Sequence, residues 1–285
     1  MTRADNLRGA MLMTLSMAGF AVEDMFIKAA AHSLPVGQVM VVMGIAGILT
    51  FGLMARRMGE PAFPSGFLAP PLLIRSGFEI GGRLFYALAI ALTPLSTTSA
   101  ILQATPLVVI AGAAILFNER VGWLRWLAVL VGLIGVLVIL RPGVAGFSAL
   151  SLLAVAGMLG FAGRDLATRA APMRLSNRQL GVIGFAMLGI AGLVILGWTG
   201  GARLPDGREA ALMLGACTFG IVGYHALTAA MRTGEVAAVT PFRYTRLVFA
   251  LILAVLLFGE RPDAQTLIGA ALVVGAGLIG LTIRR

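Results

Sequence analysis

The chain has 285 residues, of which 59% are hydrophobic and 12% are charged, and its formal net charge is +10. A water-soluble globular domain carries about 25% charged residues, because water requires a polar surface. This composition excludes a soluble domain and indicates that lipid surrounds most of the protein.

Apolar segments of about 20 residues follow one another along the whole chain. A bilayer core about 30 Å thick requires roughly 20 apolar residues for each helical crossing. A transmembrane barrel would instead show alternating segments of about ten residues, whereas Leu124–Leu140 is continuously apolar. We therefore predict an all-α polytopic membrane protein with ten transmembrane helices, at 7–30, 35–54, 68–92, 95–116, 122–140, 148–171, 179–199, 208–231, 235–258 and 264–282.

The basic residues are distributed unequally between the two sides of these helices. With a cytoplasmic N-terminus, twelve basic residues lie at inner helix ends and five at outer ends. This bias is typical of membrane topology and gives no indication of nucleic-acid binding. We expect both termini in the cytoplasm. The inner set is Arg3, Arg8, Arg56, Arg57, Arg120, Arg125, Arg169, Arg174, Arg178, Arg232, Arg284 and Arg285, and the outer set is Lys28, Arg141, Arg203, Arg208 and Arg261.

The first apolar segment follows Arg3 and Arg8, as the core of a signal peptide would. Glu23 and Asp24 interrupt it, and no small-residue cleavage site is evident, so we expect an uncleaved first helix. Cys217 is the only cysteine, which rules out an intramolecular disulfide. Neither cysteine-based metal binding nor a zinc site is supported.

The chain contains an internal repeat, in which Met17 aligns with Met158 and later positions follow at the same constant offset. Seven of fourteen positions are identical between 17–30 and 158–171, and charged residues such as Glu119 and Glu260 also fall in register. We expect one integrated membrane domain with a first repeat at 1–141 and a second at 142–285. Five helices per repeat is an odd number, so the second repeat enters the membrane from the opposite side. Inverted repeats are the architecture of secondary transporters, whose substrate sites lie near the midplane.

Two matched segments carry a family resemblance. Residues 258–280, which begin Phe-Gly-Glu-Arg, resemble the last two helices of the drug/metabolite transporter superfamily of EamA type, and Pro106 with residues 107–120 resembles the same feature in the first repeat. The second repeat has Leu247 in place of this proline. The resemblance implies gradient-linked movement of small organic molecules, and the chain is most similar to bacterial exporters of aromatic and neutral amino acids. It also implies a structural role for the helix-end residues Glu119 and Glu260.

Ionisable residues within the predicted helices are the candidates for a substrate site, because a charge at the bilayer centre requires a cavity or a partner. Arg75, Glu79 and Arg83 recur every four residues and so share one helix face. They could form an internal ion pair, line the pathway, or do both. A guanidinium group is suited to a carboxylate, so we expect Arg83 or Arg246 to bind the acid group of the substrate.

The other predicted substrate-binding residues are polar or aromatic. Gln103 precedes Pro106, which removes a backbone hydrogen bond and can expose a carbonyl group. Tyr86, Tyr244 and Phe85 are candidates for an aromatic wall, although most aromatic residues in a bundle serve packing.

Glu23 and Arg164 occupy matched repeat positions. Each lies about six residues beyond its helix centre on opposite sides, and the rise of 1.5 Å per residue separates the two by about 18 Å. A free amino acid cannot bridge that distance, so we assign Glu23 to the outer vestibule and Arg164 to the inner one. His225 has a pKa range suited to coupling, although a lone histidine is more often an interhelical hydrogen bonder.

Two acid–base pairs recur with i, i+4 spacing at matched positions. They are Asp24 with Lys28 and Asp165 with Arg169, and this spacing is typical of a helix-surface salt bridge. We predict that both are structural ion pairs.

These observations favour a secondary transporter, and neither a catalytic residue nor a cofactor or metal is expected. The primary hypothesis is a monomeric exporter of neutral or aromatic amino acids that uses alternating access in the bacterial inner membrane. The alternative is proton-coupled efflux of cationic drugs or of another metabolite, with Glu23 or Glu79 as the exchanging acid. A membrane-embedded enzyme or a channel is a remoter alternative, and the expected partners are a small-molecule substrate and the lipid bilayer.

Overall fold

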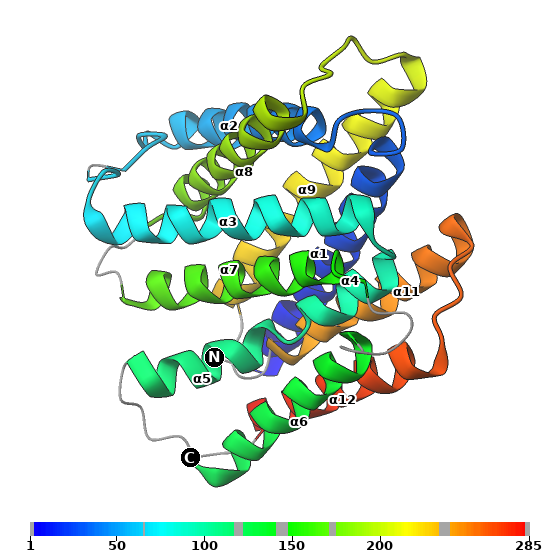
Figure 1. Ribbon diagram of the computed structural model, residues 1–285. Coiled ribbons are helices and arrows are strands. Elements are labelled where there is room, and N and C mark those ends of the chain that lie inside the picture. The colour runs from blue at the N-terminus through cyan, green and yellow to red at the C-terminus, as the bar shows by residue number, and fades with distance from the viewer. Residues whose placement is uncertain are drawn as a thin grey trace.

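The computed structural model describes residues 3–64, 66–116, 122–140, 148–170, 175–233 and 240–282, and the described part is helical (Figure 1). The helices of the first repeat are α1 (Arg3–Ala30), α2 (Val36–Arg57), α3 (Pro70–Leu92), α4 (Leu95–Leu102), α5 (Thr105–Leu116) and α6 (Trp123–Leu140). Those of the second are α7 (Ser151–Ala170), α8 (Asn177–Thr199), α9 (Gly207–Thr233), the 3-10 helix η1 (Thr240–Tyr244), α11 (Thr245–Phe258) and α12 (Ala264–Thr282).

These elements form the ten predicted crossings, with α4 and α5 together as the fourth and η1 with α11 as the ninth. Five described segments are long and apolar enough to span a membrane by length and composition. The third crossing is not among them, because α3 carries the charges of Arg75, Glu79 and Arg83. The five segments are Arg3–Ala30, Val36–Arg57, Leu95–Leu116, Asn177–Thr199 and Gly207–Ala230.

The helix pairing has the symmetry of an inverted repeat. The main packing partners are α1 with α9, α3 with α7, α2 with α8 and α6 with α12. The repeat offset converts α1 into α7 and α3 into α9, so the first two pairs exchange places and the last two map onto themselves. In Figure 1, α1 begins and α12 ends at the same end of the bundle. The inverted five-plus-five fold predicted from the repeat is therefore confirmed.

Matched glycines allow the two equivalent pairs to cross closely. A Cβ atom on Gly19 of α1 would lie 3.1 Å from the Cα atom of Gly223 in α9. A Cβ atom on Gly160 of α7 would lie 2.5 Å from the Cα atom of Gly82 in α3. The repeat offset maps Gly19 onto Gly160 and Gly82 onto Gly223. Small residues let transmembrane backbones approach each other, and here they do so at both equivalent crossings.

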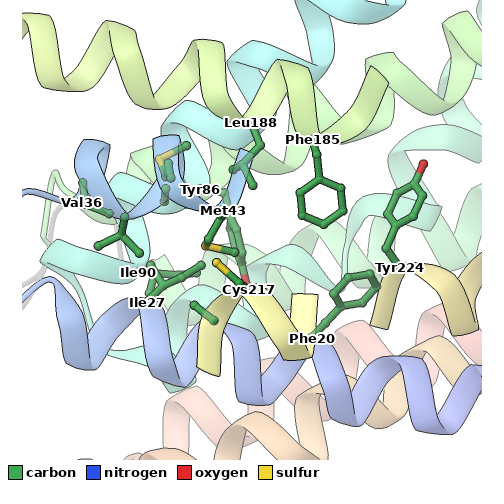
Figure 2. Close-up of a cluster of buried hydrophobic side chains, with 14 of the residues drawn as sticks. Phe20, Ile27, Val36, Met43, Tyr86, Ile90, Phe185, Leu188, Cys217 and Tyr224 are labelled. Carbon is green, nitrogen blue, oxygen red and sulfur yellow. The ribbon is translucent and has the colours of Figure 1, made fainter. Parts of the chain in front are cut away.

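The pair of α2 and α8 forms one wall of the largest buried cluster (Figure 2). The rings of Phe51 and Phe185 stack with centroids 5.7 Å apart, and the edge of Tyr224 meets both rings. Offset and edge-to-face arrangements of this kind are the favoured geometries of aromatic pairs. This cluster joins α1, α2, α3, α8 and α9 across the two repeats.

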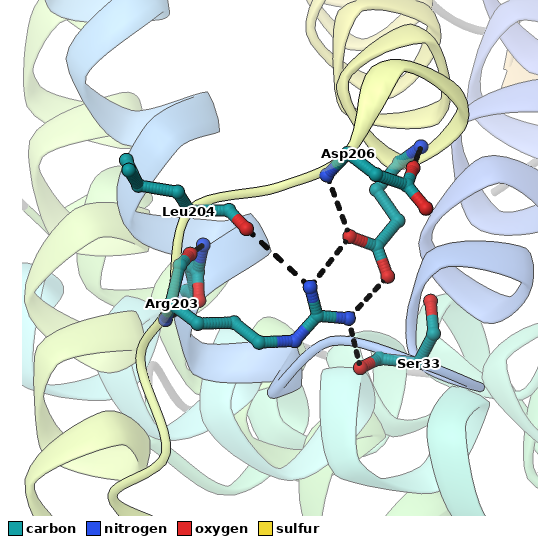
Figure 3. A network of polar contacts seen from close by, with 6 residues as sticks. Ser33, Arg203, Leu204 and Asp206 are labelled. Carbon is teal, nitrogen blue, oxygen red and sulfur yellow. Dashed lines mark hydrogen bonds and ion pairs between the residues drawn. The ribbon is translucent and has the colours of Figure 1, made fainter.

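Polar contacts fasten one end of the α2–α8 pair (Figure 3). The side-chain amide of Gln38 donates to the carbonyl of Arg203 over 2.6 Å and accepts from its backbone N–H over 3.2 Å. The guanidinium group of Arg203 forms an ion pair with Glu209 and donates to the carbonyl of Ser33 over 3.2 Å. The loop between α8 and α9 is thereby attached to the loop between α1 and α2.

The other end of the same helix pair is fastened in an equivalent way. Arg178 forms an ion pair of 2.5 Å with Glu60, and the side chain of Gln179 donates to the carbonyl of Pro61 over 3.2 Å. Gln179 is the repeat equivalent of Gln38, so matched glutamines attach opposite ends of α2 and α8 to the neighbouring loops.

The fourth and ninth crossings are interrupted at matched positions. Pro106 cannot donate a hydrogen bond to the carbonyl of Leu102, and the hydroxyl group of Thr105 donates to that carbonyl over 2.6 Å instead. The crossing breaks between α4 and α5 just before this proline, and the carbonyl that the proline could have exposed is bonded by Thr105 instead. In the second repeat, η1 gives way to α11 after Tyr244, which is the repeat equivalent of Gln103.

Candidate functional site

Most of the unsatisfied buried polar atoms in the described residues lie on one face of α3. They belong to Arg75, Ser76, Glu79 and Arg83, which follow one another at helical spacing. Buried polar groups in native structures almost always have partners, so each exception requires an explanation such as a ligand, an ion or water. This face of α3 is therefore the first place to look for a bound molecule.

Glu79 is fully buried between two arginines. Its Oε2 atom lies 2.9 Å from Nη1 of Arg75, and its Oε1 atom lies 3.6 Å from Nη1 of Arg164 in α7. The distances are those of ion pairs, but neither oxygen has a donor in hydrogen-bonding alignment. The i, i+4 pair predicted within α3 is therefore present as Arg75–Glu79, and Arg164 extends it to the second repeat.

Arg83 has a different environment from Arg75. Its Nε atom is buried and has no hydrogen-bond partner. Its guanidinium carbon lies 6.0 Å from the centroid of the Phe161 ring, and that of Arg164 lies 5.1 Å from the same ring. A guanidinium group that contacts an aromatic ring retains its N–H groups for an acceptor. Arg83 therefore has donor capacity available for a ligand.

Arg246, the other arginine predicted to bind a substrate carboxylate, already contacts one. Its Nη2 and Nε atoms donate to Oδ2 of Asp24 over 2.6 and 3.2 Å. The hydroxyl group of Tyr86 donates to the same oxygen over 3.0 Å. The guanidinium carbon of Arg246 also lies 5.2 Å from the centroid of the Phe20 ring. Asp24, Tyr86 and Arg246 thus form one buried cluster that joins α1, α3 and α11.

The prediction that Asp24 pairs with Lys28 is wrong, because each residue has a different partner. Asp24 is only 2% exposed and points into the bundle, where Arg246 supplies a two-nitrogen contact. Lys28 donates to the carbonyl of Thr93 over 2.7 Å and lies 3.7 Å from Glu260. The i, i+4 spacing is present in α1, but Asp24 and Lys28 each contact a residue outside α1. A buried charge requires a stronger partner than a surface pair provides.

Glu260 caps the N-terminus of α4. Its two carboxylate oxygens accept from the backbone N–H groups of Leu95 and Ser96 over 2.7 and 3.1 Å, and the Ser96 hydroxyl donates over 2.7 Å. The first N–H groups of a helix have no partner within the helix, and a carboxylate also complements the helix dipole. This geometry agrees with the structural role expected for Glu260. Glu119 lies outside the described residues.

The second predicted pair can be followed from Asp165 alone, because the side chain of Arg169 lies outside the described part. Oδ1 of Asp165 accepts from Nε and Nη2 of the adjacent Arg164 over 3.0 and 2.8 Å. Arg164 therefore lies between two carboxylates, those of Asp165 and Glu79. It belongs to an ionic network inside the bundle and is not an isolated vestibule charge.

Glu23 is 4% exposed, so in this structure it is buried and not in an open vestibule as predicted. It forms neither a hydrogen bond nor an ion pair with the residues that the structure describes. Arg83, Asp24 and Arg246 are the charged groups that act on it electrostatically. Of the acids within the described helices, Glu23 is thus the one whose charge has no contacting counterpart.

The remaining predicted site residues divide into two groups. The Nε2 atom of Gln103 donates to the carbonyl of Arg243 over 3.3 Å, and the buried hydroxyl of Tyr244 has no partner among the described residues, so both lie at the helix interruptions. The side chains of His225 and Phe85 are exposed. Neither side chain belongs to the buried polar cluster, whereas their neighbours Tyr224 and Tyr86 are buried. The coupling role of His225 and the aromatic-wall role of Phe85 therefore stay predictions.

The chain resembles known proteins over nearly its entire length. The sequence pattern of the EamA-like transporter family matches it twice, at residues 7–141 and 148–282. The chain belongs to the EamA-like transporter family. The repeated match agrees with the inverted repeat that relates α1–α6 to α7–α12.

Several relatives of this EamA-like transporter are named for the molecule they transport. A pseudopaline exporter of Pseudomonas aeruginosa, CntI, is 30% identical over 273 residues, which covers 94% of each chain. An S-adenosylmethionine uptake transporter of Rickettsia felis is 27% identical and covers 69% of this chain and 66% of its own. A riboflavin transporter of Rhizobium johnstonii is 29% identical, and the match covers 66% of this chain and 62% of the riboflavin transporter.

A solved structure, described only as the crystal structure of a protein, covers 98% of both chains with a TM-score of 0.67 and 19% identity. At that identity the likeness supports the fold alone. Together, the family and the named relatives establish that this EamA-like protein is a multi-pass transporter of the bacterial inner membrane that moves a small molecule, and not an enzyme.

Proposed function

We propose that this transporter exports a small metabolite with a carboxylate group, and that neutral and aromatic amino acids are its most suitable substrates. The observation that carries this proposal is the guanidinium group of Arg83, whose buried Nε atom lacks a hydrogen-bond acceptor. The other arginines of the cluster are engaged: Arg75 and Arg164 lie against Glu79, and Arg246 binds Asp24. Arg83 is therefore the group best suited to receive a carboxylate.

An aromatic side chain lies beside this position. Phe161 contacts Arg83 and meets the ring of Tyr86 edge-on, with centroids 5.8 Å apart. Phe20 lies against Arg246. A ligand bound to Arg83 would contact apolar ring surfaces, and this supports a substrate with an uncharged or aromatic side chain.

The same geometry supports alternating access between the two repeats. The helix interruptions at Gln103 and Tyr244 touch through the bond from Gln103 to the Arg243 carbonyl. In inverted-repeat transporters, matched discontinuous helices mark the midplane site around which the repeats move. Both termini would then be cytoplasmic. Similarity to a named exporter over 94% of the chain supports outward transport.

A second candidate function is the efflux of organic cations, and the unpaired carboxylate of Glu23 favours it. Counterflow in proteoliposomes separates the two. Vesicles loaded with unlabelled phenylalanine, threonine or methionine are expected to accumulate the labelled amino acid, whereas labelled tetraphenylphosphonium is not exchanged. Cation uptake without amino-acid exchange would replace the first function with the second.

A further inference from the structure

Glu23 has an unusual neighbour on α9. A Cβ atom placed on Gly220 would lie 2.8 Å from Oε1 of Glu23 and 3.0 Å from its Cδ. The carboxyl group therefore rests directly on the α9 backbone, in the space that a side chain at position 220 would fill. Any residue other than glycine would displace this carboxylate.

The inverted repeat shows what the matched position contains. The repeat equivalent of Glu23 is Arg164, and the repeat equivalent of Glu79 is Gly220. The contact of α7 with α3 thus holds the ion pair of Arg164 and Glu79, 3.6 Å apart. The equivalent contact of α1 with α9 holds Glu23 and a glycine, so one of these two positions has a complete ion pair and the other has only an anion.

An unpaired buried carboxylate is costly, because its desolvation is not offset by a counter-charge. The nearby Asp24 cannot supply the counter-charge, because it is also acidic and forms an ion pair with Arg246. Arg83 attracts Glu23 without contacting it, and its own Nε lacks an acceptor. Among the described residues, the core therefore presents an unpaired anion on α1 and a cation with free donor capacity on α3.

We infer that Glu23, lying against Gly220, binds the ammonium group of the substrate while Arg83 binds its carboxylate. The inference rests on the proposed function and narrows the substrate class to zwitterions with a primary amine. An α-amino acid carries the two complementary charges a few ångströms apart, and it would satisfy both groups at once. A carboxylic acid without an amine would leave Glu23 unpaired.

Three probes with the same aromatic ring test this assignment by isothermal titration of the purified protein in detergent. They are phenylalanine, 3-phenylpropanoate, which lacks the amine, and 2-phenylethylamine, which lacks the carboxylate. Wild-type protein is expected to bind phenylalanine about tenfold or more tightly than either analogue, the discrimination typical of a hydrogen bond to a charged group.

Glu23→Gln is expected to weaken phenylalanine binding about tenfold or more and to leave 3-phenylpropanoate within about twofold of wild type. Gly220→Ala should have the same selective effect, because the added methyl group displaces the carboxylate. Retained binding of 3-phenylpropanoate shows that each variant is folded, and Asp5→Asn is a control for the loss of an acid elsewhere on α1.

If wild type binds phenylalanine and 3-phenylpropanoate equally well, and Glu23→Gln does the same, the ammonium assignment is overturned but the proposed function is kept. Failure of both acids to bind wild type would overturn the proposed function itself. Tightest binding of 2-phenylethylamine would also overturn it and would indicate a cation transporter.

Discussion

The side chain of Gln103 donates to the main-chain carbonyl of Arg243 over 3.3 Å and so connects the interruption of the fourth crossing with that of the ninth. Each interruption is at the same place in its repeat, because Gln103 corresponds to Tyr244. The contact therefore joins the two repeats where their helices are broken, which is where inverted-repeat transporters have their midplane sites.

The buried pair of Asp24 and Arg246 should contribute strongly to stability. Removal of one partner from a buried ion pair typically costs about 3–5 kcal/mol, because the other charge is left uncompensated. Asp24→Ala and Arg246→Ala are each expected to lower the thermal unfolding temperature in detergent, and the double variant should lose less than the sum of the two. Additive losses would show that the two residues do not interact.

Glu260 should stabilise the N-terminal end of α4 through its two backbone contacts. Loss of a side-chain cap costs about 0.5–2 kcal/mol. The Glu260→Ala protein is expected to be less stable by that amount. Its amide hydrogens at Leu95 and Ser96 should exchange faster, as measured by hydrogen–deuterium exchange. Unchanged exchange at α4 would contradict the cap. Glu260→Gln, which retains an acceptor, should have a smaller effect.

The close crossing of α3 and α7 should not tolerate a methyl group. Gly160→Ala would place a Cβ atom 2.5 Å from the Cα atom of Gly82, and backbone atoms cannot rotate away. We expect a large loss of folded protein by size-exclusion chromatography. Gly81→Ala is the matched control, since a Cβ atom there meets nothing within 4 Å and alanine favours the helix by roughly 1 kcal/mol. Equal yields would show that the crossing is wider than described.

Cytoplasmic termini predict which loops face the outside of the cell. In a Cys217→Ala background, a cysteine at Leu204 between α8 and α9 should react with a membrane-impermeant maleimide in intact cells. A cysteine at Met58 after α2 should react only after permeabilisation. Both wild-type side chains are well exposed, at 92% and 65%, so accessibility to solvent does not limit labelling. The reverse pattern would invert the proposed topology.

The sequence was sufficient for the fold, because each crossing leaves a local signal. The limits of α12 and the end of α1 agree with the apolar segments, and Pro106 accounts for a break through the loss of one hydrogen bond. The interruption at Tyr244 was not predicted, because Leu247 stands at the position of Pro106. A different local signal was missed, since Pro241 lies within the 3-10 helix.

Partners across the bundle were harder to predict than helices. The i, i+4 spacing of Asp24 and Lys28 gives a local pair, whereas the true partners come from α11 and from the segment after it. One signal was available: Lys28 recurs as Arg169 and Glu119 recurs as Glu260, so acids and bases are both retained between the repeats. Charges that recur in both repeats are candidates for pairing between repeats, and Lys28 with Glu260 is such a pair.

The exposed side chains of His225 and Phe85 show a related limit. Each is adjacent to a buried tyrosine, and one residue along a helix turns a side chain by about 100°. In α9 the apolar composition is nearly the same on all sides, so it does not distinguish the interior side. In α3 the charged residues Arg75 and Glu79 do mark the interior face, which Tyr86 shares and Phe85 does not.

The role of Arg83 in binding the substrate carboxylate is tested most directly by counterflow of labelled phenylalanine in proteoliposomes with Arg83→Ala beside Arg56→Ala. Arg56 is an exposed arginine at the end of α2 and controls for the loss of a positive charge. Saturable exchange is expected from wild type and Arg56→Ala, and loss of exchange from folded Arg83→Ala. Normal phenylalanine exchange by Arg83→Ala would show that the carboxylate binds elsewhere and would contradict the proposed site.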